Sequence, residues 1–408
     1  MLVLSAVSAE REKFLVLSEL NLWPVANAPG SAMIELASDV SPLAVQLRER
    51  ITREGPMTFR DWMNAALYDP TYGYYCRADH QKWGREGDYR TSPERSPLFA
   101  ATFARYFAKL YEQLGAPTAW TIVEAGAGEG RFAQRLMQTL ADDSPGVFAA
   151  TTFILDEVGQ HSSAEARKRL ERFGDQVRFG QLADLQIDEG VVFSNELLDA
   201  LPVHRVKLDA GQYEEFYVKV DENGEFQWQL GELSAALQTG LCDYLRTIGV
   251  EPQEGQVFEV NLETGEWLRR VAYSLRRGYV VTVDYGSPAE TLFSASASQE
   301  GTLRGFRRHQ FVDDLLKDPG EHDLTTTVNW DFVKTCGARL GLDAVAFERQ
   351  DRFLLANGFL EQLEVESARA GSDAERLRLS TTAREMILPN GMAAHFQVLV
   401  QEKKTLMT

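Results

Sequence analysis

Hydrophobic positions in the first quarter of the chain change pattern twice. Residues 42–67 carry apolar side chains at helical spacing on both sides of Gly55-Pro56, which predicts two short helices. Residues 98–114 repeat phenylalanines at the same spacing and predict a third helix. The segment between them, residues 68–97, is dense in Tyr, Gly, Pro and Asp. Its apolar residues follow neither the spacing of a helix nor the alternation of a strand. Long irregular segments of this kind often carry function.

Short apolar runs then alternate with amphipathic segments. The runs predict buried strands at residues 120–124, 152–156, 177–179 and 190–194. Helical spacing at residues 131–141 and 163–173 separates the first three of them. Strands that alternate with helices indicate βαβ units and therefore a parallel sheet.

The second half of the chain interrupts this rhythm and then resumes it. Residues 213–230 alternate like an antiparallel hairpin with its turn at 222–224. Two helices are predicted near residues 233–246 and 266–276, and a buried strand at 278–285. After an irregular piece, the chain from residue 330 onward predicts helix, strand, helix and a last strand.

These elements predict an α/β fold, a doubly wound Rossmann-like sheet with an N-terminal helical region and an inserted β-hairpin/helical arm. We expect an N-terminal extension over residues 1–45, with disorder left open, and a helical and Tyr/Gly-rich lid region over 46–115. The core is expected over residues 116–402, with the insertion at about 204–275.

A glycine-rich turn follows the first predicted strand of this sheet. Residues 122–132 read I-V-E-A-G-A-G-E-G-R-F, with Gly126, Gly128 and Gly130 between strand and helix, where doubly wound sheets bind nucleotides. The dinucleotide pattern G-x-G-x-x-G needs a glycine at position 131, which is Arg131 here, and no G-x-x-x-x-G-K-[ST] motif occurs. A glycine turn that only begins a helix is the alternative.

Acidic residues near the turn narrow the choice of ligand. Glu124 precedes it and Glu129 lies within it, which disfavours pyrophosphate and favours a ligand with an ammonium and a sulfonium group. S-adenosylmethionine (SAM) is such a ligand. An acid after the second strand should accept its ribose hydroxyls, and we choose Glu157, with Asp156 as the alternative.

Polar residues also follow the fourth strand, in S-N-E-L-L-D-A-L-P at residues 194–202. At the carboxyl end of a parallel strand, Asn195, Glu196 and Asp199 would lie beside the transferable methyl group. The alternative is that Asn195 caps a helix whose dipole the two acids complement.

Six segments in the same order resemble the MidA-like family of class I SAM-dependent methyltransferases, whose mitochondrial member is a protein arginine methyltransferase that assists assembly of respiratory complex I. They are residues 66–75, 84–97, 124–130, 195–202, 283–286 and 318–325. The resemblance covers roughly residues 46–402. It implies that residues 68–97 fold over the cofactor and help form the acceptor site, and that SAM is bound by Gly126, Gly128, Gly130 and the acid near Glu157. Further cofactor-binding candidates are Glu124, Asn195, Gly87 and Asp88.

The same resemblance implies an arginine side chain as the methyl acceptor. A guanidinium stays protonated in proteins, so carboxylates must hold it and one must take a proton during transfer. Glu196 is our choice for orientation and Asp199 a weaker one, with Asn195 beside them. Asp88 and Asp284 are further candidates in the matching motifs.

Charge and composition constrain the partners. Lys and Arg number 42 against 60 Asp and Glu, so the net charge is −18, which disfavours nucleic acid and favours an Arg-bearing protein. The histidines and cysteines lack metal-ligand spacing. No apolar run approaches the ~18 residues of a membrane span. The N-terminal stretch lacks the basic character of a secretory or mitochondrial signal, so we expect a cytoplasmic location.

Several functions remain open on this evidence. The first is a SAM-dependent methyltransferase that acts on a protein arginine. The others are a methyltransferase for a small-molecule acceptor, and a SAM-binding assembly factor with little turnover. An NAD-dependent oxidoreductase is a more distant alternative, and the oligomeric state is not constrained.

Overall fold

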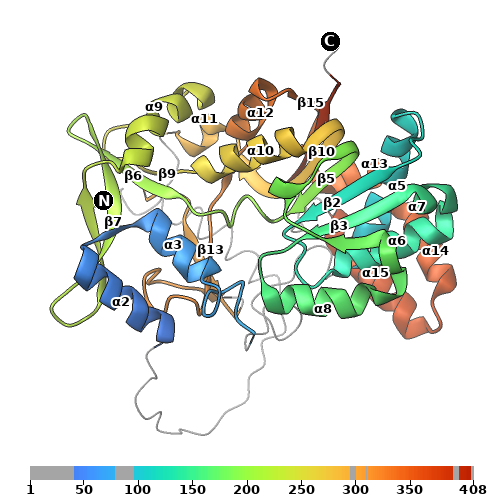
Figure 1. Ribbon diagram of the computed structural model, residues 1–408, viewed down its shortest axis with the longest axis horizontal. Coiled ribbons are helices and arrows are strands. Elements are labelled where there is room, and N and C mark those ends of the chain that lie inside the picture. Colours follow the sequence, from blue (N-terminus) through green and yellow to red (C-terminus); the bar gives the residue numbers. More distant parts are fainter. Residues whose placement is uncertain (1–40, 79–95, 295–299, 309, 389–394, 406–408) are drawn as a thin grey trace, which may run out of the picture.

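A parallel sheet is the central feature of the computed structural model, which describes residues 41–78, 96–294, 300–308, 310–388 and 395–405 (Figure 1). Its strand order is β15-β16-β10-β5-β2-β3-β4, and β14 pairs with β10. Strands β10, β5, β2, β3 and β4 are parallel, whereas β16 is antiparallel to both of its neighbours. The bounds are β2 Trp120–Ala125, β3 Thr151–Asp156, β4 Val177–Phe179, β5 Ile187–Asn195, β10 Leu275–Ser287, β14 Val328–Asn329, β15 Leu342–Arg349 and β16 Phe396–Lys403.

Alternating side chains of these strands supply two hydrophobic cores, one on each face of the sheet. In β5, Val191 and Phe193 point into one core and Val192 into the other. Helices from both halves of the chain cover the first face: α5 Pro97–Gln113, α6 Arg131–Asp143, α7 Pro145–Ala150, α8 Gln160–Leu170, α13 Gln350–Ala356, α14 Phe359–Arg369 and α15 Asp373–Ile387. The second face is covered by α10 Leu262–Ser274 and α12 Trp330–Arg339, with the short helix η2 Leu182–Asp184. The predicted doubly wound α/β fold is confirmed.

A second sheet lies beside the central one, and all of its strand pairs are antiparallel. Its order is β1-β7-β6-β9, with β8 on β7. The bounds are β1 Met57–Thr58, β6 His204–Asp209, β7 Gln212–Val220, β8 Phe226–Gly231 and β9 Val257–Val260. Helices α2 Pro42–Glu54 and α3 Phe59–Tyr68 pack on one side, as Figure 1 shows in blue, and α9 Ala235–Ile248 with α11 Ala289–Leu292 on the other. The predicted hairpin is present as β7 and β8, but it is part of this larger sheet.

Two regions differ from the prediction. The stretch expected to be irregular contains a small antiparallel sheet of β11 Arg304–Arg307, β12 Gln310–Phe311 and β13 Asp323–Thr325. Three helices, α13 to α15, lie between the last two strands where one was expected. Within the described ranges, no helix combines the length and apolar character needed to cross a membrane.

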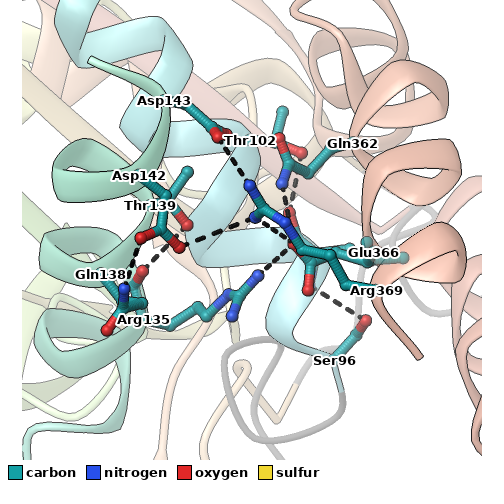
Figure 2. A network of polar contacts seen from close by, with 11 residues as sticks. Ser96, Thr102, Arg135, Gln138, Thr139, Asp142, Asp143, Gln362, Glu366 and Arg369 are labelled. Atoms are coloured by element: carbon teal, nitrogen blue, oxygen red, sulfur yellow. Dashed lines mark hydrogen bonds and ion pairs between the residues drawn. The ribbon is translucent and has the colours of Figure 1, made fainter. Parts of the chain in front are cut away.

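An ion-pair network connects α14 to α6 (Figure 2). Glu366, which is 8% exposed, pairs with Arg135 and, at 3.3 Å, with Arg369. Arg369 also contacts Asp143 at 3.0 Å, and the Gln362 amide donates to Glu366 at 3.2 Å. This network ties the C-terminal helices to the helix that begins at the glycine turn.

Candidate active site

The glycine turn at the carboxyl end of β2 has a left-handed backbone that glycine adopts readily. The φ angles of Gly126, Gly128 and Gly130 are +71°, +52° and +72°. The Gly126 N–H donates to the carbonyl of Asp156 at 2.8 Å, which holds the turn against the end of β3. A Cβ at Gly130 would come within 3.1 Å of Ala166 on α8, so packing also requires a glycine there.

Glu157, and not Asp156, faces this turn. The Glu157 carboxylate accepts from the Gly128 N–H at 2.7 Å and from the Gly159 N–H at 2.6 Å. Asp156 instead accepts from the Leu182 N–H at 3.1 Å, at the beginning of η2. The arrangement therefore places our preferred residue beside the glycines and its alternative away from them.

Glu124 lies at the end of β2 and is only 6% exposed. Burial and the nearby charge of Glu157 raise its pKa well above the ordinary value of 4.5, against a hydrogen bond from the Ala133 N–H. Its Oε2 atom has no hydrogen-bond partner among the described residues. A buried oxygen without a protein partner can accept a hydrogen bond from a bound ligand.

Glu129 has a different environment from Glu124. Its carboxylate contacts the guanidinium groups of Arg131 and Arg169, each at 3.1 Å. These two local cations already neutralise it, which weakens the expectation that Glu129 attracts a positively charged ligand.

The segment after β5 is not a helix. Strand β5 ends at Asn195 and turns follow, so the alternative that Asn195 caps a helix is wrong. Glu196 has φ +51°, a conformation that costs energy for a residue with a Cβ, and its N–H donates to the Val283 carbonyl at 2.9 Å. The Asn195 amide donates to Glu196 Oε1 at 3.1 Å. Strain of this kind is typical of functional sites.

Three carboxylates gather where β5 and β10 end: Glu196, Asp199 and Asp284. Asp284 accepts from the N–H groups of Leu198 and Tyr285, both at 2.9 Å, yet burial and the charge of Glu196 raise its pKa to about 8. Burial, Asp284 and Glu196 raise the pKa of Asp199 well above its ordinary 3.8, against a hydrogen bond from the Tyr285 side chain. Asp199 is 4% exposed, and its Oδ1 has no hydrogen-bond partner in the described part of the chain. The cluster is therefore suited to bind a cation.

The described end of the lid packs against this cluster. The Tyr68 hydroxyl donates to the Ala200 carbonyl at 3.1 Å, and the Tyr75 hydroxyl donates to Asp323 at 2.6 Å. Gly87 and Asp88, both proposed from the sequence, lie outside the described residues. Nowhere in the described ranges do three His, Cys, Asp or Glu side chains form a group that could hold a metal ion.

The model of a family described as S-adenosyl-L-methionine-dependent methyltransferases matches residues 102–348. The chain belongs to this family. The methyltransferase is also similar to a COG1565 superfamily protein of Burkholderia thailandensis whose crystal structure contains S-adenosyl-homocysteine. The two are 30% identical with a TM-score of 0.77, and the match covers 88% of this chain and 92% of that one. The predicted family, the SAM cofactor and the methyltransferase activity are thus confirmed.

Curated relatives of the methyltransferase carry a more specific name. The Drosophila melanogaster protein is named "Protein arginine methyltransferase NDUFAF7 homolog, mitochondrial", is 27% identical, and the match covers 72% of this chain and 69% of that protein. The Homo sapiens protein arginine methyltransferase NDUFAF7 is 24% identical, with 88% and 82% covered. Both relatives are named as mitochondrial, which contradicts the predicted cytoplasmic location.

Sequence reasoning missed some residues that the structure places at the site. Tyr68 and Tyr75 lie in the segment that we expected to fold over the cofactor, but neither was singled out, and Asp323 lies in a segment used only as a mark of the resemblance. Their signal was the density of Tyr in the lid and the acids of residues 318–325. Nothing in either segment alone showed that the two would meet.

Proposed function

We propose that this methyltransferase transfers methyl groups from SAM to an arginine side chain of a protein. The observation that carries the proposal is the unpartnered, buried Oδ1 of Asp199 in a cluster with Glu196 and Asp284. Clustered carboxylates with raised pKa values bind a cation favourably, because its charge relieves their mutual repulsion. The names of the curated relatives support arginine as that cation.

For the cofactor, we propose that Gly126, Gly128 and Gly130 provide the turn against which SAM packs. Glu157 is assigned to the ribose hydroxyls and Glu124 to the ammonium group of the methionine portion, with Asn195 near the sulfonium. The fit rests on the partnerless Oε2 of Glu124 and on the pairing of Glu157 with the turn. SAM supplies a methyl group on a positively charged sulfur.

In methyl transfer, the protein positions the acceptor nitrogen and removes its proton. In an in-line displacement, orientation of the acceptor nitrogen supplies much of the rate. We propose that Glu196 orients the guanidinium, since it is the least buried of the three carboxylates and held by the Asn195 amide. We propose Asp199 as the group that takes the proton, because a raised pKa suits a base that works near neutral pH.

The test uses labelled SAM and an extract of cells that lack this protein. We expect the label on protein, recovered as methylarginine after hydrolysis. Glu196→Gln should bind SAM with unchanged affinity in calorimetry and lose transfer. Glu290→Gln, at an exposed position of α11, is the matched control and should keep both. Label on a small molecule or on another residue type, or full activity of Glu196→Gln, would overturn the proposal.

A further inference from the structure

Two segments to which the proposed function gives no role meet at the acceptor site. Asp323 begins β13, is 1% exposed, and receives the hydroxyl hydrogen bond of Tyr75 at 2.6 Å. Thr326, three residues later, donates its N–H to the backbone carbonyl of Asp199 at 2.9 Å. These two bonds place β13 and the lid beside the segment that carries Asp199.

The lid side of this arrangement is aromatic. The rings of Tyr68 and Tyr75 stack with centroids 5.5 Å apart, and the Tyr68 hydroxyl donates to the carbonyl of Ala200, next to Asp199. Burial raises the pKa of both hydroxyls, and the charges of Asp323 and Asp199 raise it further. Two tyrosines and two aspartates therefore lie close together in the buried interior.

One carboxylate oxygen of Asp199 lacks a hydrogen-bond donor. Asp199 is more than nine-tenths buried, and its Oδ1 has no partner among the described residues. The charge of Asp323 adds to the rise in the pKa of Asp199, so the two carboxylates repel each other. A group with several N–H donors and a positive charge would bond the free oxygen of Asp199 and relieve this repulsion.

We propose that Asp323 is a further acceptor-binding carboxylate, which together with Asp199 holds the acceptor guanidinium, and that Tyr75 is the positioning residue that fixes Asp323. The inference rests on the proposed function. A guanidinium has five donors in a fixed plane, so it bonds two carboxylates on different edges. The stacked tyrosine rings add a flat wall on which a planar cation packs well.

Burial of the two aspartates also restricts the substrate. An acceptor must bring a long, narrow side chain to carboxylates that solvent hardly reaches. We therefore expect the methylated arginine to lie in an extended or loop segment of its protein, and not within a packed helix face.

The experiment compares full-length variants in SAM calorimetry and in steady-state methylation of the acceptor protein. Loss of a hydrogen bond to a charged group predicts a rise in the acceptor KM of about 10- to 100-fold for Asp323→Asn, with SAM affinity unchanged. Tyr75→Phe should raise the acceptor KM by a smaller factor, and Asp323→Glu should recover part of the loss. Asp313→Asn, an exposed aspartate of the same segment, is the matched control.

The outcomes separate this inference from the proposed function. Methylarginine formed by wild type and by Asp323→Asn with the same kcat/KM would overturn the role of Asp323 alone. A wild-type product without methylarginine would overturn the proposed function and the inference with it. If Asp323→Asn does not fold, Tyr75→Phe and Asp323→Glu keep the test valid, because an unchanged acceptor KM in both would reject the inference.

Discussion

Without SAM or acceptor, the stability of this methyltransferase should fall as pH rises from 6.5 to 8. Asp284 is buried beside Glu196, and its pKa is about 8 in the folded chain against an ordinary 3.8. Between these two values the folded state holds a proton that the unfolded state has released. The contribution of Asp284 to the free energy of unfolding therefore decreases with pH in this window and levels off above about pH 8.

The magnitude follows from the size of the shift. The difference between 8 and 3.8 is about four pKa units, and each unit corresponds to about 1.4 kcal/mol. Across the full window Asp284 would cost the folded state roughly 6 kcal/mol. Between pH 6.5 and 8, where the proton is only partly released, we expect a loss of about 2 kcal/mol.

The assay is urea unfolding at several pH values from 6.5 to 9, with wild type, Glu196→Gln and the control Glu290→Gln. Glu196→Gln removes the charge that, after burial, contributes most to the raised pKa of Asp284, so the slope with pH should shrink. Burial lowers the pKa of His322 from 6.5, so its contribution to stability rises with pH and changes mainly below this window. A wild-type stability that is flat or rises from pH 6.5 to 8, or an equal slope in Glu196→Gln, would refute the reasoning.

Two further predictions concern the cofactor turn and the network of Figure 2. Glu157→Gln should weaken SAM binding about tenfold or more in calorimetry, whereas Asp156→Asn should change it by less than about threefold; equal effects would contradict the assignment. Glu366→Gln removes the carboxylate shared by Arg135 and Arg369 and should lower the free energy of unfolding by about 2 kcal/mol in urea, relative to the exposed Glu364→Gln. Equal stability of these two variants would show that the network contributes nothing measurable.

The central sheet could be predicted from the sequence because its strands are buried on both faces. Such strands read as continuous apolar runs, as at Val191, Val192 and Phe193. The glycine turn was equally visible, because three alternate glycines after a strand have few other uses. Of the two acids after β3, sequence reasoning preferred Glu157, and the structure places that residue at the turn.

Apart from the hairpin of β7 and β8, the second sheet could not be predicted because its other strands are brought together by tertiary contacts. Strand β1 has two residues and pairs Met57 with Val218, far along the chain. Strand β15 was predicted after the helix at residue 330, but its place at the edge of the central sheet, where Val345 and Phe347 are exposed, was not. Local periodicity carries no information on which strands pair.

The acceptor site that we propose was partly hidden for the same reason. Its carboxylates come from the turn after β5, from β10 and from β13, and only the first two places follow the rule that ligands bind at the carboxyl ends of parallel strands. Asp323 reaches the site from an antiparallel sheet, and Tyr75 fixes it from the lid. In the absence of a cation, the charges of Asp199, Asp284 and Glu196 repel one another. The backbone of Glu196 is also strained. A bound guanidinium would remove that repulsion, so the same charges that weaken the empty protein at high pH would select the acceptor.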